Sequence, residues 1–387
     1  MDKKKIIRTA TIPLSLKIFL NGSIEPLMEK YDLVLLASPN KELEELHKLY
    51  GVKTIGVSME RHISIFKDLK SLLQLILVFY KEKPYMVHSM TPKAGLLCMI
   101  AAWIARVPRR VHTFTGLVWP TTVGIKRNLL MLADKILCIC ATNIIPEGEG
   151  VKNDLEKHIT RKPMKVLGYG NVRGVDMTFW QRPEITKGHN GAMEVAQLKN
   201  VLNLNGAFTF IFVGRLVGDK GVNELVDAFC KLYKKYSDAR LLLVGPKEDG
   251  LDPLKPATYE KINNTVQITA VGPIFGEKIL NYYAVSDCFV LPSYREGFPN
   301  TVLEAGAMGL PSIVTDVNGS REIIVDGMNG FIIPFRNADA LFDAMERMMI
   351  DNVAREKMSK NARPMIEARF EQSFVRKCLF NYYEEIM

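Results

Sequence analysis

Short runs of Val, Ile and Leu alternate with longer segments of helical periodicity along the chain. In the first half the runs that we predict to be strands are 33–37, 86–88, 110–114, 136–140 and 165–167. In the second half they are 208–213, 240–244, 266–271, 288–292 and 312–315. The helical patterns between them include 221–236, 277–286, 301–309 and 338–350. Continuous apolar strands that alternate with helices are typical of parallel sheets wrapped by helices.

Because this alternation occurs twice, we predict an α/β protein of two Rossmann-like, doubly wound domains. The 387 residues exceed what one ordinary core needs and suit two domains. A segment rich in Gly, Asn and Pro, residues 168–191, joins the halves. We place the domains at 1–185 and 186–370, and we expect 371–387 to form a helix that crosses back to the first domain. Ligands of such sheets bind beyond the carboxyl ends of the strands, so two facing domains would form a ligand-binding cleft.

The composition, with 48% apolar and 24% charged residues, is that of a globular protein rather than a disordered one. No stretch reaches the roughly 18 consecutive apolar residues that a membrane span needs. The first 20 residues begin with lysines, but Pro13 and Lys17 interrupt the apolar part and no small-residue cleavage site follows. We therefore predict a first strand and loop there rather than a signal peptide.

The six cysteines mostly lie inside apolar runs. Cys138 and Cys140 alternate within a strand-like segment, and no paired Cys or His spacing typical of zinc accompanies them. We interpret the cysteines as buried thiols of a protein in the reducing cytoplasm.

Charge is spread unevenly along the chain. Residues 1–200 carry 30 Lys and Arg against 18 Asp and Glu, a net of +12, whereas residues 201–387 carry 21 against 24, a net of −3. The first half is therefore expected to face an anion or an anionic surface.

The loop after the predicted strand 208–213 contains two cations. Gly214 permits a tight exit from the strand, and Arg215 and Lys220 flank a loop that opens a helix at Gly221. A helix N-terminus with two cations is suited to an anion, and best to a diphosphate. The alternative is that both side chains are solvated loop charges.

The loop after strand 288–292 contains two glutamates eight positions apart, Glu296 and Glu304. Pro299 suits a first helical turn and Asn300 a cap, so Glu304 would lie about one turn into the helix and Glu296 in the loop before it. For a single such pair, helix capping and surface solvation are the alternative explanation.

The two loops together resemble the family-4 retaining glycosyltransferases of the GT-B fold. The segments that carry the resemblance are "FVGRLVGDKG" and "DCFVLPSYREGFPNTVLEAGAMGLPSIVTDVNGSREIIVDGMNGFIIP" in the second half, and "VHSMTPKAGLLCMIAAWIARVPRRVHTFTGL" and "PEGEGVKNDL" in the first. The resemblance spans nearly the whole chain and is strongest to the branch that builds bacterial capsule, O-antigen and related lipid-linked glycans.

The resemblance implies that Arg215 and Lys220 hold the diphosphate of a nucleotide sugar and that Glu296 accepts hydrogen bonds from the sugar. Glu304 would bind the two ribose hydroxyls, since a carboxylate only accepts, and the segment from Gly272 to Ile274 would edge the base. No metal and no other cofactor is expected, because the two cations and a helix N-terminus replace a metal and no Asp-x-Asp motif occurs. The expected catalytic residues are Arg215, Lys220 and Glu296, and the expected donor-binding residues are Gly214, Arg215, Lys220, Ile274, Glu296, Gly297, Phe298, Pro299, Asn300 and Glu304.

The first domain is expected to bind the acceptor. Lys93 lies near the start of a predicted helix, where a lipid-linked diphosphate would find an anion site, or it is a solvated lysine. Many family members have a His directly before the Gly of the loop at 111–120, but here Thr115 precedes Gly116. His112 lies three residues earlier and is either an active-site group or a core histidine. The residues expected to line this part of the cleft are Lys93, His112, Thr115, Gly116 and Gly170.

Two apolar segments, 64–80 and 96–110, are flanked by basic residues. With the positive first half they suggest docking on an anionic cytoplasmic membrane surface, although each is also compatible with a core helix. No interleaved aromatic residues or binding module indicate nucleic acid.

We therefore predict a metal-independent retaining hexosyltransferase that moves a sugar from a UDP-sugar to a polyprenyl-diphosphate-linked saccharide. One alternative is a catalytically idle subunit that presents nucleotide sugar or acceptor to a partner enzyme. The absence of a His before Gly116 supports this alternative. The other is a nucleotide-sugar epimerase, which would lack the two-glutamate turn.

Overall fold

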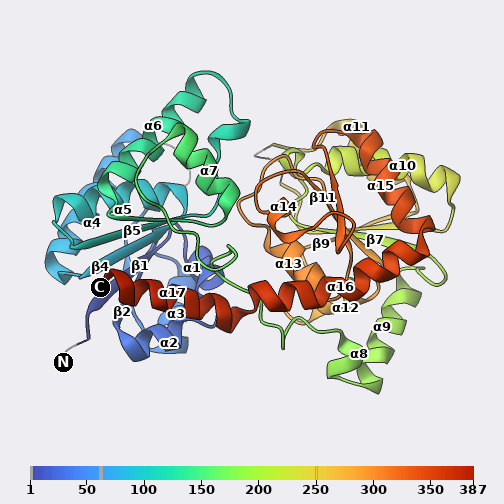
Figure 1. Cartoon of the computed structure of the whole chain (residues 1–387), viewed down its shortest axis with the longest axis horizontal. Helices are drawn as coiled ribbons and strands as arrows, with labels where there is room; N and C mark the ends of the chain where they lie inside the picture. The colour runs from blue at the N-terminus through green and yellow to red at the C-terminus, as the bar shows by residue number, and fades with distance from the viewer. Residues whose placement is uncertain (1–2, 61–63, 249, 251) are drawn as a thin grey trace. The chain divides into compact units, whose positions relative to one another are not determined.

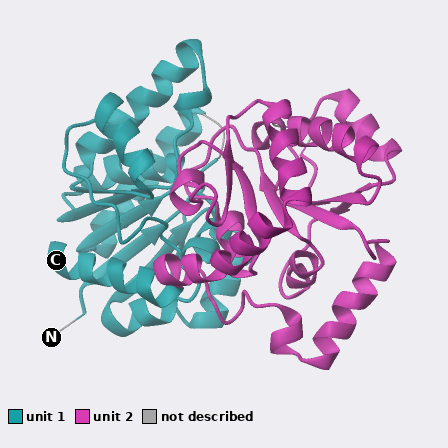
Figure 2. Ribbon diagram, turned by 45° about the vertical axis from the view of Figure 1, so that its right-hand side comes forward, with its two compact units in different colours: residues 1–174, 372–387 teal, residues 175–371 magenta. Residues whose placement is uncertain are grey.

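A computed structural model describes residues 3–60, 64–248, 250 and 252–387. The chain divides into two compact units, shown in teal and magenta in Figure 2. Unit 1 comprises residues 1–174 and 372–387, and unit 2 comprises residues 175–371. The division thus falls after Gly174, not at 185 as the composition of the joining segment suggested. The last helix belongs to unit 1.

Unit 1 is built on a six-stranded parallel sheet with the strand order β3-β2-β1-β4-β5-β6. Its inner strands are buried along nearly their whole length, as expected for strands covered on both faces. The strands are β1 (Lys5–Thr9), β2 (Asp32–Ala37), β3 (Lys53–Gly56), β4 (Met86–Met90), β5 (Arg109–Phe114) and β6 (Asn143–Pro146).

Two separate groups of apolar side chains cover the two faces of this sheet. One includes residues of α4, α5, α6 and α7, and the other includes residues of α1, α2, α3 and α17 (Figure 1). The helices of unit 1 are α1 (Pro13–Phe19), α2 (Ile24–Lys30), α3 (Lys41–Tyr50), α4 (Ile65–Glu82), α5 (Pro92–Ile104), α6 (Gly124–Cys140), α7 (Glu149–His158) and α17 (Gln372–Ile386), with a 3-10 turn η1 (Trp119–Thr121).

Unit 2 repeats the design with a second six-stranded parallel sheet, in the order β12-β11-β10-β7-β8-β9. The strands are β7 (Phe208–Val213), β8 (Ala239–Val244), β9 (Ile268–Gly272), β10 (Cys288–Leu291), β11 (Ser312–Thr315) and β12 (Gly330–Ile333). The helices are α8 (Pro183–Thr186), α9 (His189–Val201), α10 (Val222–Lys235), α11 (Pro256–Asn264), α12 (Lys278–Ala284), α13 (Asn300–Ala307), α14 (Ser320–Ile323), α15 (Ala338–Ile350) and α16 (Asn352–Phe370), with a 3-10 turn η2 (Gly218–Lys220). The predicted class of two doubly wound α/β domains is therefore confirmed.

Two predicted strands of the first half are wrong. Residues 136–140 are the last turns of helix α6, and the sixth strand of the sheet is Asn143–Pro146 instead. Residues 165–167 form no strand; Met164 makes only an isolated bridge to Ile144. The alternating apolar pattern around Cys138 and Cys140 misled because a short apolar run does not distinguish a strand from a helix that is apolar on several sides. Both thiols are buried, as are Cys98 and Cys288, whereas Cys230 and Cys378 are half-buried.

The C-terminal helix α17 is joined to the sheet of unit 1 by a buried polar network. Arg8 of β1 donates a hydrogen bond to the Tyr383 hydroxyl at 2.8 Å. The same hydroxyl bonds to Nδ1 of His88, and Nε2 of His88 lies 2.7 Å from the Thr113 hydroxyl. Burial and the nearby Arg8 charge lower the pKa of His88 well below its usual value, so its imidazole is neutral. Tyr383 is thus the acceptor for a buried cation.

Tyr383→Phe is expected to lower the free energy of unfolding by about 2–3 kcal/mol, since a buried charged donor loses its acceptor. Urea denaturation measures the change. The neighbouring Tyr382→Phe is the matched control: its hydroxyl accepts only from the neutral Asn143 amide, at 3.2 Å, and its loss should cost about 1 kcal/mol. Equal losses in the two variants would contradict a special role for Arg8.

Candidate functional site

The order of the strands in unit 2 defines where two loops meet. The chain enters the sheet at β7 and adds β8 and β9 on one side of it. The next strand, β10, lies on the other side of β7. β7 and β10 are hydrogen-bonded neighbours, so the loops that follow them leave the same edge of the sheet. Such a reversal of strand order is where open α/β sheets bind their ligands.

These two loops contribute a cation and a carboxylate that are in direct contact. Lys220, at the end of η2, donates a hydrogen bond to Glu296 with an Nζ–Oε1 distance of 2.5 Å. The side chains are only 22% and 10% exposed, so the pair is largely shielded from water. The sequence predicted both residues as ligand contacts, and the structure places them together.

The close approach of the two loops depends on Gly221. Its φ is +71°, a left-handed conformation, and a Cβ atom there would lie 2.0 Å from the carbonyl oxygen of Pro292. Any residue with a side chain at this position would therefore push the β10 loop away from the β7 loop. The glycine at this position is required by packing as well as by the turn.

The second predicted cation, Arg215, is paired with a residue that the sequence did not single out. Its guanidinium lies 2.5 Å from a carboxylate oxygen of Glu248, in the loop after β8. Arg215 is about half exposed, so a ligand can reach it from solvent. Only the tertiary structure reveals Glu248, because 33 residues separate the partners. A diphosphate entering here would compete with Glu248 and Glu296 for the two cations.

Five of the other predicted donor residues follow Glu296 along the chain. Pro299 immediately precedes helix α13, where Glu304 is buried one turn from the start. Phe298 is buried and packs edge-on against Phe370, with 5.4 Å between ring centres. Gly297 and Asn300 are half-buried. A carboxylate in such a low-dielectric place is well suited to accept from hydroxyl donors.

A glycine of a third loop, Gly319 after β11, supports this turn and was missed by sequence reasoning. Its φ is +72°, and a Cβ atom would lie 2.3 Å from the carbonyl oxygen of Gly297. The loop after β11 therefore packs directly on the backbone that positions Glu296. The signal in the sequence was the Asn-Gly-Ser turn that follows strand 312–315.

Two open hollows lie at the same edge of the sheet. One, of about 600 Å³, is lined by Leu216, Gly245, Lys247 and Gly272, from the loops after β7, β8 and β9. The other, of about 840 Å³, is lined by Ile274, Phe275 and residues of α9 and α12. Each is within the size range of ligand pockets. Gly272 and Ile274, predicted to edge the base, thus lie in adjacent hollows rather than in a single one.

In unit 1 the strand order reverses between β1 and β4, and here the backbone is strained. Thr91, directly after β4, has φ +73°, which is uncommon for a residue with a side chain. Its hydroxyl accepts a hydrogen bond from the backbone N–H of Thr11, which follows β1, at 3.1 Å. Strain of this kind, held by neighbouring bonds, is often found at functional sites.

Lys93, the predicted acceptor contact, lies in the first turn of α5. It forms an ion pair with Asp68 of α4, with an N–O distance of 2.5 Å, and both side chains are less than 20% exposed. Its charge is therefore balanced within the protein, and its binding of an acceptor anion stays a prediction.

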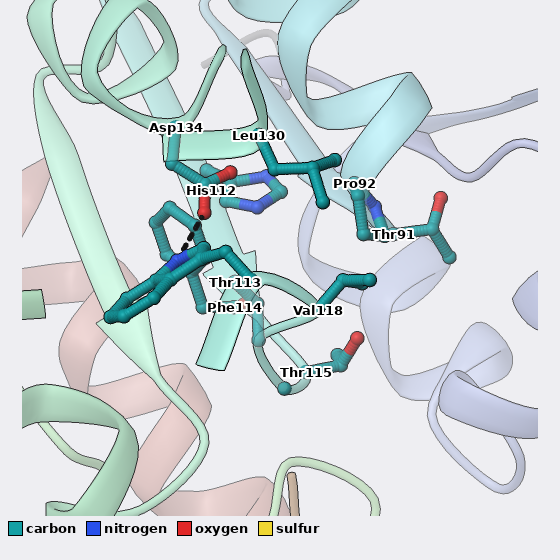
Figure 3. Close-up of a pocket in the computed structure, with 11 residues that line it drawn as sticks. Thr91, Pro92, His112, Thr113, Phe114, Thr115, Val118, Leu130 and Asp134 are labelled. Carbon is teal, nitrogen blue, oxygen red and sulfur yellow. Dashed lines mark hydrogen bonds between the residues drawn. The ribbon is translucent and has the colours of Figure 1, made fainter. Parts of the chain in front are cut away.

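His112, Thr115 and Gly116 line a small cavity together with Asp134 and Trp119 (Figure 3). The cavity has a volume of about 30 Å³, enough for a water molecule. Gly170 is buried in unit 1 but does not line this cavity, and its backbone N–H donates to the Leu167 carbonyl at 3.0 Å. The structure thus brings together three of the five predicted acceptor residues.

His112 is a buried residue at the wall of this cavity. Its Nδ1 lies 2.8 Å from the Ser89 hydroxyl, and burial lowers its pKa to about 3. The imidazole is therefore neutral at physiological pH and has the surroundings of a core histidine.

Asp134 of α6 is the titratable group that the sequence did not indicate. Its carboxylate accepts a hydrogen bond from the Trp119 indole at 3.1 Å. Burial raises the pKa of Asp134 to about 7, so the carboxyl is partly protonated at neutral pH. A group that can donate or accept a proton thus lines the same cavity as Thr115.

The raised pKa of Asp134 predicts a pH dependence of stability. Folding favours the protonated acid, so its contribution is complete below the unfolded-state pKa of about 4 and is lost as pH rises towards 7. The stability of the protein relative to Asp134→Asn should therefore fall by up to about 1.4 kcal/mol per pH unit over this range. Thermal unfolding of both proteins at several pH values measures it; a constant difference would show that Asp134 ionises normally.

Comparison with known proteins identifies the family. Residues 194–365 match the family described as "Glycosyl transferases group 1", and residues 16–145 match "Glycosyl transferase 4-like". CapM of Staphylococcus aureus, a capsular polysaccharide biosynthesis glycosyltransferase, is 34% identical over 394 residues, covering 100% of this chain and 98% of CapM. The chain belongs to the group 1 (GT4) glycosyltransferases. The matched segments contain both loops of the unit 2 site and the cavity of unit 1.

Another relative of this glycosyltransferase is an Escherichia coli enzyme, UDP-Gal:alpha-D-GlcNAc-diphosphoundecaprenol alpha-1,3-galactosyltransferase. It is 33% identical over 312 residues, covering 79% of this chain and 76% of the enzyme. Among solved structures, HepE of Anabaena in complex with UDP and glucose has a TM-score of 0.81 at 16% identity, covering 99% and 100% of the two chains. WaaG, involved in lipopolysaccharide biosynthesis, has a TM-score of 0.71 at 14% identity, covering 96% and 98%. These likenesses show the GT-B fold.

Proposed function

We propose that this glycosyltransferase moves a sugar from a UDP-sugar to a polyprenyl-diphosphate-linked saccharide, with retention of configuration, during synthesis of a bacterial surface polysaccharide. The observation that carries the proposal is the similarity to two relatives. CapM, similar over the whole chain, is named for capsular polysaccharide. The E. coli enzyme is named for a UDP-linked donor and an undecaprenol-diphosphate acceptor.

The site in unit 2 supports a diphosphate-containing donor. Lys220 and Arg215 lie in one loop, each held by a carboxylate from another loop. We propose that the diphosphate replaces these carboxylates as the partner of the cations, which releases Glu296 to accept hydrogen bonds from the sugar hydroxyls. Glu304 would take the ribose diol. The hollow beside Gly272 is the proposed place of the base.

The proposed chemistry needs little from side chains beyond position and charge. The acceptor hydroxyl would approach the face that the diphosphate leaves, and a departing phosphate oxygen would take its proton. Lys220 and Arg215 would stabilise the negative charge that develops on the diphosphate. We propose that no metal takes part. Within the described part of the chain, no group of three or more His, Cys, Asp or Glu side chains is arranged to hold one.

The test is a transfer assay with a panel of radiolabelled UDP-sugars and an undecaprenyl-diphosphate-linked N-acetylglucosamine acceptor. Transfer from one UDP-sugar, with the anomeric configuration of the donor in the product, is the expected result. Addition of EDTA should leave the rate unchanged, and a loss of rate that Mg²⁺ restores would contradict the metal-free mechanism. UDP binding without transfer to membrane lipid extract from any donor would favour the idle-subunit alternative.

A further inference from the structure

Helix α4 has a second apolar side that the core does not use. Its inner side packs on the sheet through residues such as Leu75 and Phe79, which are at most 1% exposed. Its outer side also carries large apolar residues at every third or fourth position, and they are exposed, with Phe66 87% and Leu77 68% accessible. The members of this stripe are Phe66, Leu69, Leu73, Leu77 and Tyr80. Because burial in the fold does not explain the stripe, it indicates a contact outside the chain.

Helix α6 repeats the arrangement. Leu137 and Cys138 are buried against the core, whereas Ile125 is 80% and Ile139 is 69% exposed. The exposed stripe again follows helical spacing and consists of Ile125, Leu129, Leu132, Ile136 and Ile139. Two such stripes of five residues each are unusual for a surface that faces only water.

The two stripes belong to one surface. Helix α5 packs against α4 on one side and against α6 on the other, and Figure 1 shows the three helices on the same face of the unit 1 sheet. The Tyr80 hydroxyl donates to the Ile104 carbonyl at 3.1 Å, which joins α4 to the end of α5. Trp103 of α5 is also exposed. We call this surface the α4–α6 face, defined by the two stripes and Trp103.

The structure distinguishes the two apolar segments that the sequence indicates. For residues 96–110 the sequence leaves membrane docking and a core helix open, and in the structure most of α5 is buried, including Leu97, Met99 and Ala102. That segment is a core helix with one exposed tryptophan. Because the pattern of residues 136–140 predicts a strand, the sequence does not indicate the outer stripe of α6. Of the two expected segments, 64–80 alone supplies an exposed stripe.

Charge on the α4–α6 face is positive. The acidic side chains of α4 and α6 are engaged inside the protein: Asp68 pairs with Lys93, Glu82 pairs with Lys5 and Lys53, and the Asp134 carboxylate is bonded to Trp119. The basic side chains are instead exposed. They include Lys70, Lys81, Lys126 and Lys135. The surface thus combines apolar stripes with exposed lysines, which is typical of helices that lie on an anionic bilayer.

We propose that the α4–α6 face docks on the surface of an anionic lipid bilayer, with the two stripes at the boundary between headgroups and acyl chains. The lysines would contact the anionic headgroups. A second copy of the chain is a poorer partner, because a two-fold interface would place two positive faces against each other. Across the described ranges, no helix is long and apolar enough to cross a membrane. The contact is therefore with the surface of the bilayer.

The functional reason for this docking rests on the proposed function, in which the acceptor is lipid-linked. An acceptor on a polyprenyl diphosphate is held in a bilayer, and unit 1 carries the predicted acceptor residues. Docking through α4, α5 and α6 would bring this unit to the membrane in which such an acceptor resides.

Vesicle flotation tests the proposal without any sugar transfer. The protein is mixed with vesicles of phosphatidylcholine, with or without phosphatidylglycerol. We expect flotation with the anionic vesicles and much weaker flotation with the neutral ones. The triple variant Phe66→Ser, Leu73→Ser, Leu77→Ser should bind anionic vesicles at least about tenfold more weakly, since each substitution removes an apolar side chain that would be buried in the bilayer.

Matched controls separate lipid binding from folding. The altered residues are exposed, so the melting temperature should not fall. Val266→Ser, Ile350→Ser, Val353→Ser removes three exposed apolar residues of unit 2 and should float as the unaltered protein does. Lys70→Glu with Lys126→Glu should reduce flotation with anionic vesicles only, by about tenfold or more, because both lysines would contact anionic headgroups.

Several outcomes would overturn the proposal. One is unchanged flotation of the Phe66/Leu73/Leu77 variant, and another is equal recovery with neutral and anionic vesicles. A third is that the unaltered protein is a dimer in solution and this variant is a monomer. Transfer to a water-soluble, short-chain acceptor distinguishes this failure from failure of the proposed function. If the protein floats but transfers no sugar, the docking proposal stands and the proposed function is refuted. If it transfers sugar but never floats, the proposed function stands and the docking proposal is refuted.

Discussion

Glu296→Gln is expected to lower the turnover of sugar transfer by roughly 100-fold, a size typical of losing one preorganised polar contact at the reacting centre. Glutamine keeps the volume and the hydrogen-bonding reach of the side chain but not its charge. It therefore breaks the ion pair with Lys220, whose Nζ lies 2.5 Å from the carboxylate. It also weakens acceptance of hydrogen bonds from sugar hydroxyls, since a neutral amide oxygen is a poorer acceptor than a carboxylate.

The measurement is the initial rate at saturating UDP-sugar and acceptor, with the melting temperature as the check on folding. Glu346→Gln is the matched control. Glu346 pairs with Lys235 at 2.7 Å in the same unit, on helices α15 and α10, and is not part of the site. Its variant should keep full activity. A Glu296→Gln protein with near-normal turnover would remove this residue from the reacting centre.

Arg215→Ala combined with Lys220→Ala is expected to weaken UDP binding by about 100-fold or more. Each lost charge-assisted contact to the diphosphate costs about 1.5 kcal/mol or more, and the two act on the same ligand. Isothermal titration calorimetry with UDP measures the affinity directly and needs neither sugar nor acceptor. The two substitutions also leave Glu248 and Glu296 without their partners, which adds repulsion of the anion.

A control for the general loss of positive charge comes from the same helix that follows Lys220. Lys231 and Lys235 of α10 pair with Asp339 and Glu346 and are more than half exposed. Lys231→Ala with Lys235→Ala should bind UDP as the unaltered protein does, since both lysines lie two or more turns further along the helix. Unchanged affinity in the Arg215/Lys220 variant would refute the diphosphate assignment. An equal loss in both double variants would show that net charge alone matters.

Most of the candidate donor site could be predicted from local pattern. The strands 208–213 and 288–292 are continuous apolar runs, and each is followed by a loop with glycine and charged residues. Parallel strands expose the loops after them at one edge of the sheet, so the sequence predicts that Lys220 and Glu296 share a site. The ion pair between them confirms that proximity. Their roles in binding and catalysis stay predictions.

Other features depended on contacts between distant segments. Glu248 meets Arg215 across 33 residues, and Asp134 has a raised pKa only because the fold buries it beside Trp119. Neither residue stands out in the sequence, because a carboxylate in a loop or helix is normally solvated. The same holds for Gly319. A side chain at this position would clash with the backbone of Gly297, which belongs to another loop.

The fold class and the two-unit design could be predicted from the period of the apolar residues. The family was indicated by the resemblance of the segments that contain Arg215, Lys220, Glu296 and Glu304. Tertiary structure decided which apolar side of a helix is buried. Helices α4 and α6 are apolar on more than one side, and a pattern of apolar residues does not state which side the sheet covers. Only the packing on α5 and the sheet fixes that choice. It leaves one apolar stripe of each helix exposed on the surface.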